Sequence, residues 1–195
     1  MVVGLGNPGA EHEASRHNVG FQVVEALAGR AGATLRRRRH GSLFARVVLD
    51  AEELLLVKPL TFMNDSGSSV SAWQRALGLT PQQMVVIHDD LDLPASRLRI
   101  KAGGAHGGHR GVRSIIEAIG SGDFLRIKVG IGRPRQGRGP VEHVLGPFEE
   151  AEREEIDAAV KRAADAVEVL LQEGLEAAMN RYNVRARRRQ DSRAQ

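Results

Sequence analysis

Residues 2–20, VVGLGNPGAEHEASRHNVG, are the stretch around which the rest of this chain is organised. Val2 and Val3 are β-branched and predict a short strand, which the glycines and the proline of GLGNPG (4–9) bring to an end. The residues RHN (16–18) then come directly before an apolar pattern with helical spacing. A tight turn that holds an amide side chain, with a histidine one loop later, can present polar groups beside a sheet edge. His17 is therefore a candidate catalytic base.

The composition indicates one soluble globular domain. The chain has 195 residues, of which 42% are hydrophobic and 27% charged, and this length suits a single core. No apolar run approaches the roughly 18 residues of a membrane span, and no signal peptide is evident, so we expect a cytoplasmic protein without membrane contact. The absence of cysteine excludes disulfides, thiolate metal sites and a thiol nucleophile.

The net charge of +4 comes from the C-terminal tail. Five arginines follow residue 183 against only Asp191, so the rest of the chain carries as many acidic as basic residues. We expect residues 184–195 to be a basic, disordered tail. A second basic run, RRRR at 36–39, predicts a solvated turn or the start of an edge strand, with RNA contact as the alternative.

Strand and helix patterns alternate along most of the chain. Period-2 or wholly apolar segments predict strands at 42–50, 53–58, 84–87, 97–101 and 124–132, the first two joined as a hairpin through a turn at 51–52. Apolar residues at helical spacing predict helices at 21–31, 65–79, 112–119, 149–173 and 175–182. This alternation favours an α/β sandwich with a mixed sheet.

GLGNPG follows a strand and matches the G-x-G-x-x-G dinucleotide fingerprint. That fingerprint also needs a helix that begins at the glycines and an acidic residue about 20 residues further on that ends the next strand. Pro8 and the segment up to Asn18 delay the helix, and Glu25 lies inside it. These features argue against nucleotide binding.

A metal centre is a second alternative, because His88, Asp89, Asp90, His106 and His109 are ligand types of hydrolytic metal sites. Their spacing fixes no ligand geometry. A histidine–carboxylate pair that acts on water accounts for the residues better: a neutral imidazole takes a proton near neutral pH when a carboxylate orients it. Asp89 follows an apolar strand, where functional residues of open α/β sheets gather, and is a candidate partner for His17.

Neutral amides and basic strand faces complete the candidate site. The asparagines Asn7, Asn18 and Asn64 could hold a carbonyl group or a water without competing for protons, although each alone could be a turn or cap residue. Alternation places Arg99 with Lys101 on one strand and Arg126 with Lys128 on another. Together they could clamp a phosphate, or they could be ordinary exposed strand faces.

Five motifs follow one another along nearly the whole chain: GLGNPG with RHNVG, KPLTFMNDSG, VVIHDDLDLP, KAGGAHGGHRGVRSI and RIKVGIGRP. Together and in this order they resemble the motifs of the bacterial peptidyl-tRNA hydrolase family. The resemblance implies a single-domain α/β/α sandwich around a twisted mixed β-sheet, with residues 1–183 as the catalytic domain. It also implies a monomer without cofactor, metal or obligate protein partner, which hydrolyses the ester between peptide and tRNA and so recycles tRNA from aborted translation.

The resemblance also assigns roles to individual residues. His17 would be the catalytic base and Asp89 its support. Asn7 resembles the residue that recognises the peptide and rejects free aminoacyl-tRNA, and Asn64 would position the substrate and the attacking water. The residues implied to bind the acceptor stem, the 3′ end or the peptide are His12, Phe62, Met63, Asn64, Arg99, Lys101, His109, Arg110 and Lys128, with Arg99, Lys101 and Lys128 forming a clamp for the tRNA 5′ phosphate.

Two residues depart from the family pattern. Arg110 stands where the family usually has asparagine, so an arginine–phosphate contact would replace an amide contact to the acceptor end. His12 stands where tyrosine is usual, which weakens any stacking contact there. The rival function is that of a non-catalytic RNA-binding relative. The presence of His17, Asp89, Asn7 and Asn64 argues against it, because a protein that only binds RNA does not need this set.

Overall fold

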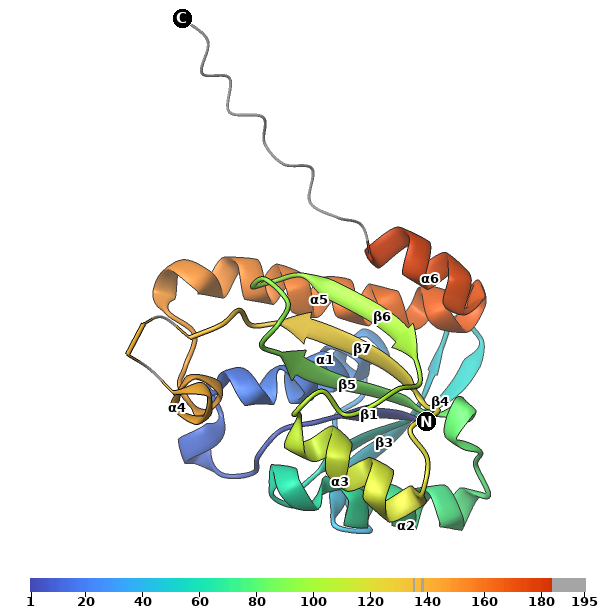
Figure 1. Cartoon of the computed structure of the whole chain (residues 1–195). Coiled ribbons are helices and arrows are strands. Elements are labelled where there is room, and N and C mark those ends of the chain that lie inside the picture. Colours follow the sequence, from blue (N-terminus) through green and yellow to red (C-terminus); the bar gives the residue numbers. More distant parts are fainter. Residues whose placement is uncertain (135, 138, 184–195) are drawn as a thin grey trace, which may run out of the picture.

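A computed structural model describes residues 1–134, 136–137 and 139–183 of the chain. Strand β1, formed by the first residues of the opening stretch, lies at the centre of its sheet, where it pairs with β4 on one side and β5 on the other (Figure 1). The basic tail predicted for 184–195 falls outside the described residues.

The sheet has seven strands in the order β2-β3-β4-β1-β5-β7-β6. Their bounds are β1 Val2–Gly4, β2 Arg37–Arg39, β3 Ser42–Leu49, β4 Glu52–Pro59, β5 Val85–Asp90, β6 Leu98–Ala102 and β7 Leu125–Gly130. The four central strands run parallel, whereas β2, β3 and β6 join by antiparallel pairing. The sheet is therefore mixed, as predicted, and the parallel strands end on the left side of Figure 1.

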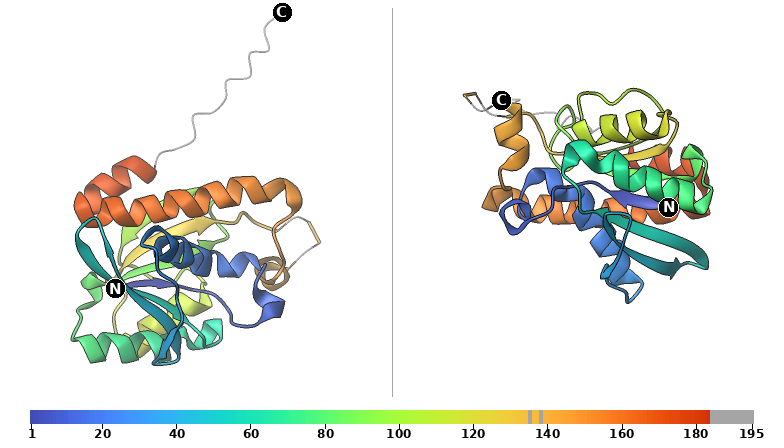
Figure 2. Two further views of the ribbon diagram at one scale, coloured as in Figure 1. Left: turned by 180° about the vertical axis from the view of Figure 1, so that it is seen from behind. Right: turned by 90° about the horizontal axis from the view of Figure 1, so that it is seen from below.

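Helices cover both faces of this sheet (Figures 1 and 2). Helices α1 and α5 pack on one face, and α2 and α3 on the other; α4 and α6 flank α5 in the sequence. The bounds are α1 Val19–Arg30, α2 Ser66–Leu77, α3 Arg110–Ile119, α4 Pro140–Leu145, α5 Glu150–Gln172 and α6 Gly174–Tyr182. The predicted α/β/α sandwich in a single domain is confirmed.

Two apolar cores follow from strand alternation. Val2 of β1 faces the core under α1 and α5, whereas its neighbour Val3 faces the core under α2 and α3. Successive residues of a strand point to opposite faces, so a strand covered on both sides is apolar throughout. This is why Val85, Val86 and Ile87 form an unbroken apolar run that delivers the polar residues after it to one edge of the sheet.

Glycines of the opening stretch let α1 pack directly against β1. A Cβ atom on Gly4 would lie 2.1 Å from the carbonyl oxygen of Gly20, and one on Gly20 would lie 2.5 Å from the backbone nitrogen and oxygen of Leu5. Real Cβ atoms do not approach so closely, so both positions require glycine. Close packing of the first turn of α1 places His17, two residues before that helix, beside the end of β5.

Several boundaries differ from the predicted ones. The β3–β4 turn is formed by Asp50 and Ala51, both with positive φ, and not by residues 51 and 52. Helix α2 ends at Leu77, before a left-handed Gly78, and β5 continues to Asp90. Helix α4 was not predicted, because six residues give too short a periodic pattern.

Residues 37–39 form the edge strand β2, with all three side chains exposed. In the described ranges, no helix is both long and apolar enough to span a membrane.

Candidate active site

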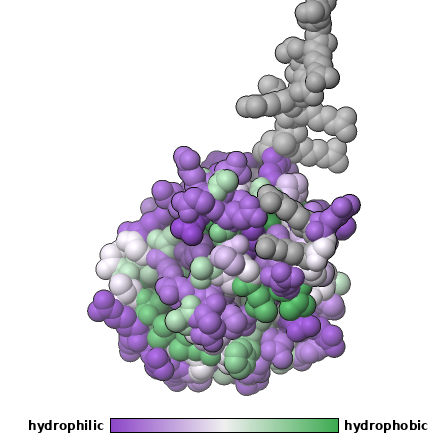
Figure 3. All heavy atoms as spheres, turned by 90° about the vertical axis from the view of Figure 1, so that its left-hand side faces the viewer, coloured by the Kyte–Doolittle hydropathy of each residue, from purple (hydrophilic) through white to green (hydrophobic). Residues whose placement is uncertain are grey.

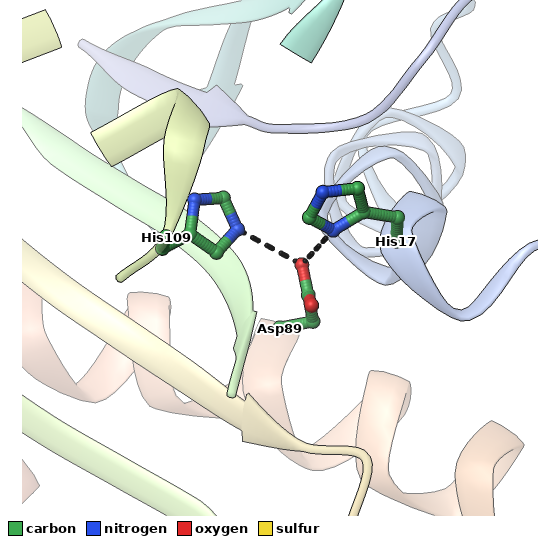
Figure 4. Close-up of side chains that lie close together, drawn as sticks. All are labelled: His17, Asp89 and His109. Carbon is green, nitrogen blue, oxygen red and sulfur yellow. Dashed lines mark hydrogen bonds and ion pairs between the residues drawn. The ribbon is translucent and has the colours of Figure 1, made fainter. Parts of the chain in front are cut away.

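The carboxyl end of β5 is the meeting point of three segments that are far apart in the sequence. Asp89 comes from β5, His17 from the 3-10 turn Arg16–Asn18 before α1, and His109 from the loop between β6 and α3. Figure 4 shows the two imidazole rings on either side of the carboxylate. All three side chains line one cleft of about 320 Å³, which α4 borders with Val141 and Val144.

One oxygen of Asp89 accepts two hydrogen bonds. Its Oδ1 lies 2.6 Å from His17 Nδ1 and 2.9 Å from His109 Nε2. Burial would raise the pKa of Asp89, but the charge and hydrogen bonds of His109 and then His17 outweigh it and hold the pKa well below its ordinary value. The carboxylate is therefore ionised and can only accept, so both ring nitrogens that face it carry hydrogen.

This arrangement determines which ring nitrogen of His17 can accept a proton. With the Nδ1 hydrogen donated to Asp89, the neutral ring keeps a lone pair on Nε2. The His17 side chain is 10% exposed. A carboxylate that holds one ring nitrogen while the other faces a cleft is the geometry of a general base that acts on water.

His109 lines the cleft, and its predicted contact with substrate stays a prediction. Its ring is also held within the protein: Nδ1 accepts from the backbone N–H groups of Gly111 and Val112, at 3.1 and 3.2 Å, while Nε2 donates to Asp89. Both ring nitrogens are thus occupied within the protein. His109 caps the N-terminus of α3 and ties that helix to the carboxylate.

His88 belongs to the same cluster, and our sequence reasoning considered it only as a metal ligand. It is 2% exposed, its Nδ1 donates to the backbone oxygen of Asp89 at 2.6 Å, and its ring meets that of His109 at a centroid distance of 4.5 Å. Burial lowers the pKa of His88 well below its ordinary value, so the ring is neutral. No local sequence signal distinguishes this position from a core histidine.

Asn7 is oriented by the loop that carries Met63. The Met63 backbone N–H donates to Asn7 Oδ1 at 2.7 Å, which leaves the Asn7 amide nitrogen without an acceptor among the described residues. The Met63 side chain is only 3% exposed and lies in the apolar core, contrary to its expected place beside the substrate. Its backbone, and not its side chain, serves the site.

Asn18 is a structural residue of the opening loop. Its Oδ1 accepts from the Asn7 N–H at 2.7 Å, and its Nδ2 donates to the carbonyl oxygens of Asn7 and His12 at 3.0 and 2.8 Å. The amide therefore fastens two turns of the loop, one of them the turn that ends at His12. Asn7 itself lines a second hollow, together with Pro8, Lys58 and other residues.

Phe62 and Asn64 lie on the surface next to this network. Phe62 is 64% exposed, and Asn64 is exposed on the 3-10 turn Met63–Asp65. Neither lines the cleft of His17 or the hollow of Asn7 in the described part of the chain. The structure thus brings His17 and Asp89 together, whereas Asn7 lines a separate hollow and Asn64 lies on the surface next to Met63.

Of the four basic residues on β6 and β7, Arg99 and Lys101 have no ion-pair partner among the described residues. Arg99 pairs in register with Lys128, and Lys101 with Arg126, so four cations lie on one face. Burial and then the charges of Arg126, Lys128 and Arg99 lower the pKa of Lys101. Arg126, which we considered for a phosphate clamp, is 1% exposed and instead donates to the carbonyl oxygens of Gly104, Ala105 and Gly122.

Lys128 forms an ion pair with Asp90, and Arg110 lines the cleft of His17. The Lys128 ammonium donates to Asp90 Oδ2, and both residues line the cleft of His17. Arg110 is exposed, lines the same cleft and is the first residue of α3. A cation at a helix N-terminus opposes the helix dipole, so its position is not explained by the stability of α3.

This geometry gives little support to a metal site or a nucleotide site. Ligand atoms of His17, Asp89 and His109 lie within 4.8 Å of one another, but the two histidines already hydrogen-bond to a single carboxylate oxygen. Asp90 pairs with Lys128, and His106 accepts from the N–H of Gly108. For a nucleotide, α1 begins only at Val19, well after the glycines of GLGNPG.

The sheet edge that carries these residues has a mixed surface. Figure 3 shows the left-hand side of Figure 1, where hydrophobic patches interrupt a largely hydrophilic face. Val141 and Leu145 of α4 are among the exposed apolar residues, at 53% and 40%. A partly apolar cleft with a few polar groups and cations at its border suits a ligand that is partly charged and partly apolar.

Comparison with known proteins gives a uniform result. The family model described as peptidyl-tRNA hydrolase matches residues 1–192. The chain is 47% identical to the peptidyl-tRNA hydrolase of Nocardia farcinica over 94% of this chain and 95% of that protein, and 48% identical to that of Rubrobacter xylanophilus over 94% and 100%. The crystal structure of the peptidyl-tRNA hydrolase from Acinetobacter baumannii superposes with a TM-score of 0.88 at 37% identity, covering 94% of this chain and 93% of that one.

Proposed function

This chain belongs to the peptidyl-tRNA hydrolase family and hydrolyses the ester bond between peptide and tRNA; we propose that His17 and Asp89 carry out that reaction in the cleft at the end of β5. The single observation that carries the proposal is the 2.6 Å contact between His17 Nδ1 and Asp89 Oδ1. It leaves His17 Nε2 without a hydrogen-bond partner among the described residues, so this nitrogen can act as the base.

In the proposed reaction, His17 Nε2 takes a proton from water as the water oxygen attacks the ester carbonyl carbon. The ionised Asp89 stabilises the imidazolium that forms. The bond between the carbonyl carbon and the ribose oxygen then breaks, and His17 returns the proton to that oxygen. The products are a peptide with a free carboxyl group and a tRNA with a free terminal hydroxyl.

Substrate selection would depend on neutral amides and cations around the base. We propose that the free amide nitrogen of Asn7 donates to a carbonyl oxygen of the peptide, because Met63 holds the other end of that side chain. Exposed Asn64 and Phe62 would hold the 3′ end of the tRNA. His12, in the opening loop, stays a proposed substrate contact. Arg99, Lys101 and Lys128 would bind the 5′ phosphate and Arg110 another phosphate of the acceptor end, since arginine suits phosphate geometry.

We place the protein in the cytoplasm as a monomer without an obligate partner, and we assign catalysis to residues 1–183. The substrate supports this proposal, because peptidyl-tRNA is a product of translation. In the described part of the chain, the groups that the reaction needs come from one copy of the protein.

The test is hydrolysis of an N-blocked aminoacyl-tRNA by purified protein with and without chelator. We expect metal-independent deacylation, loss of activity in His17→Ala, and a fall in kcat of roughly 100-fold or more in Asp89→Asn with KM largely kept. Activity that survives His17→Ala would rule out the proposed base. Tight tRNA binding without hydrolysis would instead favour the RNA-binding relative.

A further inference from the structure

Arg16, the residue directly before His17, is a buried charged residue. It is 3% exposed, and its guanidinium donates from Nη1 to Glu152 Oε1 at 3.0 Å and from Nη2 to Glu152 Oε2 at 2.6 Å. Its guanidinium carbon lies 4.7 Å from the ring centre of Phe148. Two parallel hydrogen bonds and an aromatic face fix the orientation of the guanidinium as well as its position.

Backbone contacts extend this connection. The Arg16 N–H donates to the carbonyl oxygen of Gly146 at 3.0 Å, and Ser15 forms a β-bridge with Pro147. The segment before His17 is thereby joined to the connection between α4 and α5. Glu152 is itself held in place, because its Oε2 also accepts from the Glu149 N–H at 2.7 Å.

The position of this pair is not explained by helix packing. A second ion pair, between Arg30 at the end of α1 and Glu168 of α5, also joins the α1 region to α5, but at an exposed site. In the Arg16 pair the guanidinium is removed from solvent, at 3% exposure, whereas the Glu152 side chain is 31% exposed, so the arginine bears most of the desolvation cost. The Arg16 pair differs from the Arg30 pair in its place: it borders His17 on one side and α4, a wall of the cleft, on the other.

We infer that the Arg16–Glu152 pair is a latch that holds the His17 ring in line with Asp89 and fixes α4 beside it. Arg16 and Glu152 are then positioning residues for the hydrolysis, and this inference rests on the proposed role of His17. Without the latch, the turn that carries His17 moves relative to β5, and the base spends less time in the reactive arrangement. Misplacement by about 1 Å can lower a rate by roughly 100-fold.

The experiment compares Glu152→Gln with the matched control Glu168→Gln. Each removes one carboxylate of α5 that pairs with an arginine of the α1 region, but only Glu152 adjoins the His17 turn. We expect kcat to fall about tenfold or more in Glu152→Gln with KM within about twofold of wild type, and kcat to be unchanged in Glu168→Gln. The downfield NMR signal of the His17 Nδ1 hydrogen that bonds to Asp89 should broaden only in Glu152→Gln.

Arg16→Lys serves as a second variant, since it keeps the charge but loses the forked pair of hydrogen bonds. If the two residues act as one latch, the double variant Arg16→Lys/Glu152→Gln loses no more activity than either single variant. A normal kcat in both single variants, with His17→Ala inactive, overturns the latch and leaves the proposed function intact. Equal losses in Glu152→Gln and Glu168→Gln that follow the melting temperature also overturn it. An active His17→Ala removes both proposals.

Discussion

At the scale of single residues, the site consists of three histidines around one carboxylate, and the histidines differ in which ring nitrogens have hydrogen-bond partners. His17 keeps a free nitrogen, His109 has both nitrogens occupied, and His88 is neutral and fully enclosed. These differences arise from hydrogen-bond partners and burial, since the side chains are identical. Replacement of any one of them should therefore have its own signature, and not a common loss of function.

His88 leads to a prediction about pH. Because its pKa is lower in the folded protein than in the unfolded chain, the unfolded chain binds more protons as the pH falls below about 6.5. Stability should thus fall between pH 7 and pH 5. His88→Phe keeps an aromatic ring against His109 but does not titrate, so the drop in melting temperature between these pH values should be smaller than in wild type. An undiminished drop would show that His88 is not its source.

At the scale of elements, the glycines of the opening stretch serve packing more than turn formation. Gly4 and Gly20 bring the backbones of β1 and α1 into contact, and α1 in turn carries the His17 turn at its N-terminus. The loop of His109 is held in a comparable way, because buried Arg126 donates to the carbonyl oxygens of Gly104 and Ala105 in that loop. The loops that carry His17 and His109 are thus held against the sheet by contacts outside the cleft.

Gly20→Ala tests the close approach. The added methyl group would meet backbone atoms of Leu5 and Ile87 at 2.5 Å, none of which is a flexible side chain, so we expect a loss of about 1–3 kcal/mol in the free energy of unfolding. Gly29→Ala in the same helix meets nothing within 4 Å and should gain about 0.5–1 kcal/mol from helix propensity. Urea unfolding measures both, and equal effects of the two substitutions would contradict this explanation.

At the scale of the whole molecule, cations gather where the substrate would arrive. Arg99 and Lys101 on the edge strand β6, with no ion pair to a described residue, lie beside Lys128, whose neighbour Asp90 borders the cleft. Like charges placed opposite one another across strands are unfavourable, so an anionic ligand offers a reason for the arrangement. The RNA substrate of the family supplies such an anion.

Arg99→Gln and Lys101→Gln should therefore raise KM while kcat changes little. The slope of log KM against log salt concentration should become shallower, because fewer counterions are released when phosphates are bound. Arg153→Gln, at an exposed position of α5 with a local partner in Glu150, is the matched control and should leave both quantities unchanged. An unaltered salt slope in the β6 variants would place the phosphate contact elsewhere.

The sequence by itself determined the α/β architecture and the family, and it singled out His17 and Asp89 as a pair. Apolar periodicity is a local property, and the motifs are read residue by residue, so these conclusions did not need coordinates. The sequence also indicated a base at His17 and a carboxylate at Asp89, although 72 positions separate them. Short elements escaped it, among them α4 with its six residues.

Only the tertiary structure decided which partner each polar group takes. It joined His109 to the carboxylate, buried Met63, which we had expected beside the substrate, and Arg126, which we had considered for a phosphate clamp, and paired Arg16 with Glu152 across 136 positions. Hydrogen bonds depend on distances of about 3 Å between groups that the chain brings together from afar. The glycines Gly4 and Gly20 of the opening stretch thus allow α1 to pack against β1, while the hydrogen bond between His17 and Asp89 of β5 depends on how the chain folds as a whole.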